Sequence, residues 1–256
     1  MISYLMRVLR NRVLKSDEGC RQGHLTMSSS LIKVLSLLTY VLLEIYHRVL
    51  WKVRRSIKWR DYILEIEYGV FSPVGTVSTS LLAKVIEYVL GRVKGVKLGL
   101  DVGTGTGALA LVLSRYCQYV VATDISRVAC RVAKRNLHRY SVLGDVVLCD
   151  VASVLRAKSI DVVVMNPPYL PISRKLRHGD LYSGSMYIKF VLEALRVARR
   201  LVLTSLSTYL KQVSTETTKT LKSLKARTIA TVIVSPLERV EVMYISPRVR
   251  SKCTNR

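Results

Sequence analysis

The stretch Gly99-Leu100-Asp101-Val102-Gly103-Thr104-Gly105-Thr106-Gly107 decides the fold of this chain. The apolar run 96–100 leads into it, and the apolar run 108–113 follows it at helical length. This order predicts a buried strand, a glycine-rich turn and a helix. Three alternate glycines let a ligand approach the backbone closely. The D-x-G-x-G-x-G spacing differs from the G-x-G-x-x-G of dinucleotide-binding proteins, and no lysine follows it as in a phosphate-binding P-loop.

The composition narrows the class of protein. Half of the 256 residues are hydrophobic, which is enough for one large domain, alone or with an N-terminal extension. The formal net charge of +24 favours a polyanionic partner, so we expect the basic surface to contact RNA or the ribosome. A generally basic, solvated surface is the alternative. The five cysteines and four histidines are scattered, so neither a disulfide framework nor a metal site is predicted.

Residues 1–60 are predicted to form a basic N-terminal extension of a domain that covers residues 61–250. Residues 1–26 lack an apolar core followed by a small-residue cleavage site, so we expect a cytoplasmic protein rather than a secreted one. Met27 opens a cleaner sequence, in which Ser28-Ser29-Ser30 is typical of a helix start. Translation that begins at Met27 is therefore an alternative to the start at Met1.

The apolar segment 31–53 predicts a mostly buried amphipathic helix rather than a membrane span. Its charge-free part, 34–43, has only ten residues, which is too short to cross a bilayer. Polar side chains three or four positions apart form a narrow stripe on this helix: Lys33, Ser36, Tyr40, Glu44, His47 and Arg48. In the basic run 51–60, two tryptophans alternate with cations. This run indicates either nucleic-acid contact or a solvated helix end with two half-buried tryptophans.

The rest of the chain predicts an α/β fold with a mainly parallel seven-stranded sheet. Strands are expected at 96–101, 119–124, 145–150, 160–165, 200–205, 228–234 and 238–245. Helices are expected at 78–90, 106–116, 126–139, 184–198 and 214–225, so strands and helices alternate as in a sheet covered on both faces. Only residues 235–237 join the last two strands, which should therefore form an antiparallel hairpin at one edge.

Four successive strands end in a polar residue followed by a turn. These residues are Asp101, Asp124, Asp150 and Asn166. Ligands of open parallel sheets bind beyond the carboxyl ends of the strands, where all four should lie together. Helix capping is the ordinary role of a single such acid. Four of them beside a glycine-rich turn indicate a ligand site.

This set resembles the class I S-adenosylmethionine-dependent methyltransferases, which have a Rossmann-like fold. The resemblance implies S-adenosylmethionine as cofactor, with its methionine part against the backbone of Gly103, Gly105 and Gly107. It implies that Asp124 binds the ribose hydroxyls and Asp150 the adenine amino group, while Ile125 and Val151 sandwich the ring. Asp101, Thr76 and Asn166 complete the expected cofactor site.

The tetrapeptide Asn166-Pro167-Pro168-Tyr169 resembles the N-P-P-Y motif of methyltransferases that act on planar nitrogens. The resemblance implies that the Asn166 side-chain carbonyl and the Pro167 backbone carbonyl accept the two N–H bonds of the target. Tyr169 would supply a stacking face, and the two prolines stiffen the loop so that this geometry is preorganised. A plain loop breaker is the alternative reading of this tetrapeptide.

Over residues 62–246 the chain is similar to the release-factor glutamine methyltransferases, which modify the glutamine of a Gly-Gly-Gln tip. The shared features are Tyr169-Leu170-Pro171, a glycine-containing loop at 179–184 and the C-terminal strand, helix and hairpin. One branch of that family pairs with a small zinc-binding activator protein, and the sequence leaves such a pairing open. The family also carries acidic residues in the loop before the core, whereas 72–79 has none and offers the hydroxyls of Thr76, Ser78 and Thr79 instead.

The sequence therefore predicts methyl transfer from S-adenosylmethionine to a planar nitrogen, with a release-factor glutamine amide as the favoured substrate. One alternative is an exocyclic amine of an RNA base, N6 of adenine or N2 of guanine, flipped into the pocket. A catalytically silent RNA-binding scaffold is a second alternative, against which the intact set of acids argues.

Overall fold

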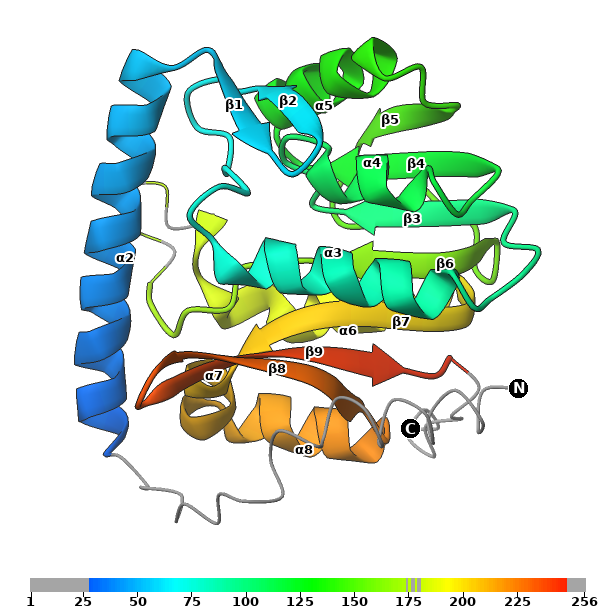
Figure 1. Ribbon diagram of the computed structural model, residues 1–256. Coiled ribbons are helices and arrows are strands. Elements are labelled where there is room, and N and C mark those ends of the chain that lie inside the picture. The colour runs from blue at the N-terminus through cyan, green and yellow to red at the C-terminus, as the bar shows by residue number, and fades with distance from the viewer. Residues whose placement is uncertain (1–27, 174, 176–177, 179–180, 248–256) are drawn as a thin grey trace.

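The computed structural model describes residues 28–173, 175, 178 and 181–247. The expectations for residues 1–27, including a start at Met27, and for Gly179 lie outside these residues. The described chain is built on a seven-stranded sheet with the strand order β5-β4-β3-β6-β7-β9-β8, and a separate two-stranded hairpin joins the N-terminal helix to it (Figure 1).

Five neighbouring strands of the sheet are parallel, and the last two are antiparallel. The parallel strands are β5 (Gly144–Leu148), β4 (Tyr119–Asp124), β3 (Leu98–Val102), β6 (Ile160–Met165) and β7 (Ala198–Ser207). The antiparallel strands are β8 (Arg227–Ser235) and β9 (Glu238–Ile245). The predicted edge hairpin is confirmed, and β9 lies between β7 and β8.

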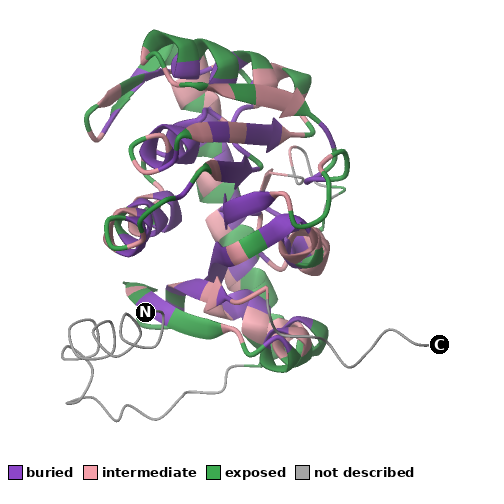
Figure 2. Ribbon diagram, turned by 90° about the vertical axis from the view of Figure 1, so that its right-hand side faces the viewer, coloured by how far each residue is buried: buried purple, intermediate pink, exposed green. Residues whose placement is uncertain are grey.

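Helices cover both faces of the sheet because the strands alternate their side chains between two apolar clusters. One cluster joins strand residues to α3 and α4, and the other joins them to α6 and α8. Figure 2 shows buried residues concentrated in the central strands. The helices after α2 are α3 (Val77–Leu90), α4 (Ala108–Leu113), α5 (Arg127–Arg139), the 3-10 turn η3 (Gly184–Met186), α6 (Tyr187–Val197), α7 (Thr208–Val213) and α8 (Thr215–Ser223). The predicted fold class is confirmed.

Residues 56–65 form the antiparallel hairpin of β1 (Ser56–Trp59) and β2 (Tyr62–Glu65), which spans the predicted domain boundary at residue 60. Trp59 is buried in the main core, and its indole N–H faces the Ser80 hydroxyl at 3.4 Å. Trp51 is half-buried and donates to the Val70 carbonyl at 2.9 Å. Trp59 is therefore covered by the core and cannot stack on a nucleic acid, whereas contact through Trp51 and the cations of the run 51–60 stays a prediction.

The N-terminal helix α2 (Ser29–Val53) forms, but the prediction that it is mostly buried is wrong. Its five buried residues are Ile32, Ser36, Tyr40, Glu44 and His47, so four of the six residues of the predicted polar stripe face the domain. Lys33 is exposed, and so is most of the apolar face. Among the described residues, α2 is the one helix that is long and apolar enough to cross a membrane, and only 22% of its most apolar window is buried.

Two buried residues of the polar stripe, Glu44 and His47, have partners on two loops of the domain. The imidazole Nε2 of His47 accepts the Ser72 backbone N–H at 3.1 Å, and its Nδ1 lies 2.8 Å from the Leu43 carbonyl. One carboxylate oxygen of Glu44 contacts both Arg48 at 2.7 Å and His178 at 2.8 Å. Burial lowers the pKa of His47, so the neutral ring bridges α2 to the loop before α3.

Candidate functional site

A cavity of about 570 Å³ lies beyond the carboxyl ends of the parallel strands. Because β5, β4, β3 and β6 are consecutive and parallel, the turns that follow them meet at this edge. Eleven of the thirteen predicted site residues line the cavity: Thr76, Gly103, Gly105, Asp124, Ile125, Asp150, Val151, Asn166, Pro167, Pro168 and Tyr169. Asp101 and Gly107 do not. Thr39 and Leu43 of α2 form part of its wall.

The glycine-rich turn is held against the end of β4. Gly103, Gly105 and Gly107 have φ values of 68°, 55° and 82°, in the left-handed region that strains other residues. The N–H groups of Gly103 and Thr104 donate to the Thr123 carbonyl at 2.8 and 2.9 Å. Glycine is therefore favoured at these positions by the backbone dihedrals, in addition to the close approach of a ligand that the sequence predicts.

Asp101 lies behind the turn rather than in the cavity. One of its carboxylate oxygens accepts the Thr104 hydroxyl at 2.7 Å and the Ala110 N–H at 3.0 Å. Its other oxygen, Oδ1, is buried without a hydrogen-bond partner among the described residues. Burial raises the pKa of Asp101 to about 7 despite these two donors. Asp101 thus braces the turn and retains one unused acceptor.

Asp124 ends β4 with its carboxylate fixed from both sides. Oδ2 accepts the Gly105 N–H and Oδ1 accepts the Ser126 N–H, each at 2.9 Å. Burial raises the pKa of Asp124, while these backbone donors oppose the rise. The carboxylate has about four lone-pair sites, so it can accept a further donor beside these backbone groups. Because the residue lines the cavity, the carboxylate is placed to accept a pair of hydroxyls.

Asp150 and Val151 follow β5 at the far side of the cavity. The Asp150 carboxylate is exposed and ion-pairs with Lys189 of α6. Val151 has a φ of 56°, which is rare for a β-branched residue and marks local strain. Ile125 lines the cavity with 69% of its surface exposed, so it offers an uncovered apolar face. Sequence reasoning missed Lys189, which only the fold brings to this acid.

Asn166 begins the loop after β6 with both ends of its amide engaged. Its Nδ2 donates to the Thr79 hydroxyl at 2.9 Å, and its Oδ1 accepts the Ser205 hydroxyl. Ser205 is fully buried in β7 and fixes the orientation of the amide group. One lone pair of Oδ1 remains for a further donor. Sequence reasoning missed Ser205, which carries no motif.

The hydroxyls at the N-terminus of α3 support the Asn-Pro-Pro-Tyr loop. Thr76 donates to the Pro73 carbonyl at 3.0 Å, and its hydroxyl lies 3.3 Å from that of Thr79. Burial raises the pKa of Tyr169 to about 12, and a hydrogen bond with Ser78 opposes that rise. Thr79 and Ser78 therefore hold the two ends of the loop, at positions where the similar family carries acids.

Glu238 is a carboxylic acid on the cavity wall that sequence reasoning also missed. It begins β9, is 6% exposed, and accepts the Ser207 hydroxyl at 2.7 Å. Burial raises its pKa, so the neutral form is favoured over a wider pH range than usual. No sequence signal marks Glu238, because only the insertion of β9 beside β7 brings it to the cavity.

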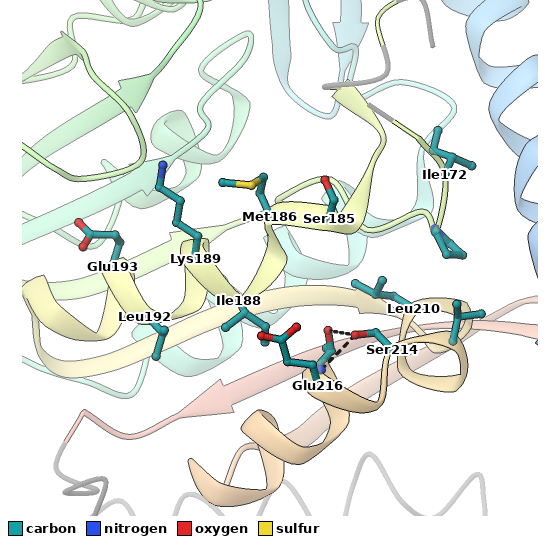
Figure 3. A pocket seen from close by; sticks show the side chains of 14 residues that line it. Ile172, Ser185, Met186, Ile188, Lys189, Leu192, Glu193, Leu210, Ser214 and Glu216 are labelled. Carbon is teal, nitrogen blue, oxygen red and sulfur yellow. Dashed lines mark hydrogen bonds between the residues drawn. The ribbon is translucent and has the colours of Figure 1, made fainter. Parts of the chain in front are cut away.

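A groove of about 720 Å³ adjoins the cavity at Met186 and Lys189. Figure 3 shows it between α6 and the helices α7 and α8, with Ile188 and Leu192 pointing in from α6. Leu210 and Ile172 extend its apolar lining, and carboxylates lie along it at Glu193 and Glu216. The groove is large enough for a few side chains of an extended peptide.

Comparisons with known proteins support the predicted family. Residues 61–178 match the family model of the methyltransferase small domain. The chain is 30% identical over 156 residues to a ribosomal protein L11 methyltransferase of Desulforamulus reducens, covering 54% of this chain and 49% of that protein. It is 43% identical over 75 residues to a release factor glutamine methyltransferase of Moorella thermoacetica, covering 28% and 26%. The chain thus spans about half, or less, of the length of these relatives.

Solved methyltransferase structures have a similar fold. The 16S rRNA methyltransferase RsmC of T. thermophilus, in complex with AdoMet and guanosine, superposes with a TM-score of 0.54 at 20% identity. That match covers 75% of this chain and 50% of RsmC. The predicted resemblance to class I S-adenosylmethionine-dependent methyltransferases is confirmed, and the relatives include release factor, ribosomal protein and rRNA methyltransferases.

Proposed function

We propose, from the methyltransferase domain at residues 61–178, that this chain transfers a methyl group from S-adenosylmethionine to a glutamine side-chain amide of a translation protein, a peptide-chain release factor. The observation that carries this proposal is the amide of Asn166, fixed by Thr79 and Ser205 at the wall of the cavity. These two contacts fix the direction of Oδ1, whose remaining lone pair can accept a hydrogen bond from a group in the cavity.

The described residues fit the cofactor. Asp124 has two carboxylate oxygens with spare lone pairs, the glycine turn exposes backbone, and Ile125 offers an uncovered apolar face. Asp150 would meet the adenine edge while it exchanges its contact with Lys189. When bound, S-adenosylmethionine supplies an electrophilic methyl group on a sulfonium.

The protein's part in the chemistry is alignment. A planar nitrogen shares its lone pair with the neighbouring π system and is a weak nucleophile. Asn166 Oδ1 and the Pro167 carbonyl would accept its two N–H bonds and aim it, and the rigid loop makes this geometry available before the substrate binds. Acceptors at this point also stabilise the positive charge that develops on the nitrogen during transfer.

Two observations favour a protein over an RNA substrate. The groove beside the cavity has an apolar lining from Ile188, Leu192 and Leu210, which suits peptide side chains better than a phosphate backbone. Part of the basic charge is also engaged internally, since Arg131, Arg135 and Arg139 pair with Glu65 or Glu67. The RNA base amine remains the second candidate because of the net charge of +24.

Transfer of labelled methyl from S-adenosylmethionine into a cell extract tests the substrate class. We expect wild-type protein to label material that protease removes and nuclease leaves intact, and Asn166→Ala to label neither. Label that nuclease removes would identify an RNA base amine instead. Measurable cofactor binding without any transfer would point to the silent scaffold.

A further inference from the structure

The outer face of α2 is an uninterrupted apolar stripe. We define the outer stripe as seven residues of this face, each between 41% and 69% exposed: Val34, Leu37, Leu38, Val41, Leu42, Ile45 and Val49. Between Lys33 and Lys52 the charged side chains are Glu44, which is buried, and Arg48, which is 39% exposed and pairs with Glu44. A stripe of this size is uncommon on a monomeric soluble protein and marks an interaction surface.

The opposite face ties α2 to the domain. Glu44 and His47 are buried and bonded to His178 and Ser72, and Ser36 is buried with its hydroxyl on the Ile32 carbonyl. A helix that crossed a bilayer would have to give up these contacts or bury the domain with it. Figure 1 shows α2 along one side of the domain, and most residues of its exposed face are apolar.

Cations lie at both ends of the outer stripe. Lys33 is exposed at one end, and Lys52, Arg54 and Arg55 are exposed at the other. At 1.5 Å per residue, Lys33 and Lys52 are about 28 Å apart along the axis. The one acidic residue of α2, Glu44, is buried and paired with Arg48. The exposed surface of the helix is thus apolar in its middle and positive at its ends.

This charge pattern favours one of the two partners that could cover the outer stripe, a second copy of the chain or a lipid surface. In a symmetric dimer through α2, an antiparallel pairing would place Lys33 against Lys52 of the other copy, and a parallel pairing would place each cation against itself. Residues 1–27 are also basic, with five Lys and Arg against two acids. Anionic lipid head groups complement the pattern, because they attract the ends while the acyl region accepts the middle.

We propose that the outer stripe of α2 adsorbs to a membrane surface that contains anionic lipid, with the helix in the plane of the interface. The apolar residues enter the boundary between head groups and acyl chains, and the terminal cations bind the head groups. The domain stays on the water side, held by the buried face of α2. This proposal is independent of the methyl acceptor and stands or falls by itself.

Sedimentation of the full chain with vesicles tests the proposal. We expect binding to vesicles of phosphatidylcholine and phosphatidylglycerol in equal parts, with part of the bound protein resistant to a high-salt wash. The paired substitution Leu38→Glu and Leu42→Glu should weaken binding about tenfold or more, because the two leucines would no longer be transferred from water into the lipid. The matched control is Leu143→Glu with Val154→Glu, at positions 68% and 64% exposed elsewhere on the surface.

The control pair adds the same negative charge but leaves the outer stripe intact, so it should lower binding only slightly. All four positions are exposed, and thermal unfolding of each variant checks that the fold is retained. Equal loss in both pairs, or complete release by salt, would reduce the interaction to general electrostatics and overturn the proposal. A wild-type dimer that the α2 pair dissociates, without vesicle binding, would assign the stripe to a second copy. Vesicle binding by a chain that starts at Met27, but not by the full chain, would mean that residues 1–26 occupy the outer stripe and would overturn the proposal.

Discussion

The side-chain nitrogen of Asn166 lies 2.9 Å from the hydroxyl oxygen of Thr79, although 87 positions separate the two residues. This contact joins the first turn of α3 to the loop after β6, and it fixes which end of the Asn166 amide faces Ser205. The acceptor proposed to aim the target nitrogen is therefore oriented by two hydroxyls from different parts of the chain.

Replacement of Asn166 separates binding from chemistry. Asn166→Ala should leave the affinity for S-adenosylmethionine nearly unchanged, because Asp124 remains in place. Turnover should fall by about 10²–10³, the usual loss for one preorganised hydrogen bond to a developing charge. Asn166→Asp retains an acceptor and should keep more activity than Asn166→Ala. Calorimetry and turnover measured side by side check both statements, and full turnover in Asn166→Ala would remove the planar-nitrogen assignment.

Removal of the Thr79 hydroxyl tests the orientation of Asn166. Thr79→Val keeps the shape of the side chain but leaves the Asn166 N–H without its acceptor. A lost neutral hydrogen bond is worth about 0.5–1.5 kcal/mol, so turnover should fall by up to about tenfold. Thr79→Ser should restore it. If Thr79→Val and Thr79→Ser are equally active, the contact does not position the amide.

Asp124 is expected to carry much of the cofactor affinity. Asp124→Ala removes charge-assisted hydrogen bonds worth about 1.5–3 kcal/mol, which corresponds to a roughly ten- to hundredfold larger dissociation constant. The control is Asp145→Ala on the neighbouring strand, where the carboxylate accepts the Tyr119 hydroxyl outside the cavity. Calorimetry on both variants distinguishes the site from general loss of charge, and an unchanged constant in Asp124→Ala would leave that acid as a helix cap.

The buried carboxyl of Asp101 predicts a specific pH dependence of stability. Burial raises its pKa from the ordinary 3.8 to about 7, so between these values the folded protein holds a proton that the unfolded chain has lost. Its contribution to stability is full below pH 3.8 and disappears as pH rises through about 7. Relative to Asp101→Asn, the wild type should therefore lose up to about 4 kcal/mol across this window.

Urea unfolding of both proteins at the two ends of that window measures the effect. Other titrating groups are common to the two proteins and cancel, and the fixed cost of the asparagine is the same at each pH. A constant difference between wild type and variant would mean that Asp101 titrates normally.

The part of the site that follows strand ends was predictable from sequence. Asp124, Asp150 and Asn166 each stand next to a turn, and parallel strands of one sheet must bring their ends together. Lys189, Ser205 and Glu238 were not predictable, since each reaches the cavity through packing between segments far apart in the chain. A lone serine or glutamate in a strand carries no local signal of such a contact.

The prediction that α2 is mostly buried was wrong for a physical reason. Spacing shows that a polar stripe and an apolar face exist, but it does not show which of them the domain covers. The usual assignment sends charges to water. Here one oxygen of Glu44 is matched by Arg48 and His178, and His47 is matched by Ser72, which offsets part of the cost of burial. The other oxygen of Glu44 is buried without a partner among the described residues.

The position of β9 in the sheet has a consequence for how the protein is made. On the ribosome, β8 emerges before β9, yet β8 is joined to the sheet only through β9. Residues 227–235 must therefore wait without a strand partner until residues 238–245 have been synthesised. Glu238, which belongs to the cavity wall, arrives in the same step. The cavity is therefore complete only when this strand joins the sheet, after every other described element has been synthesised.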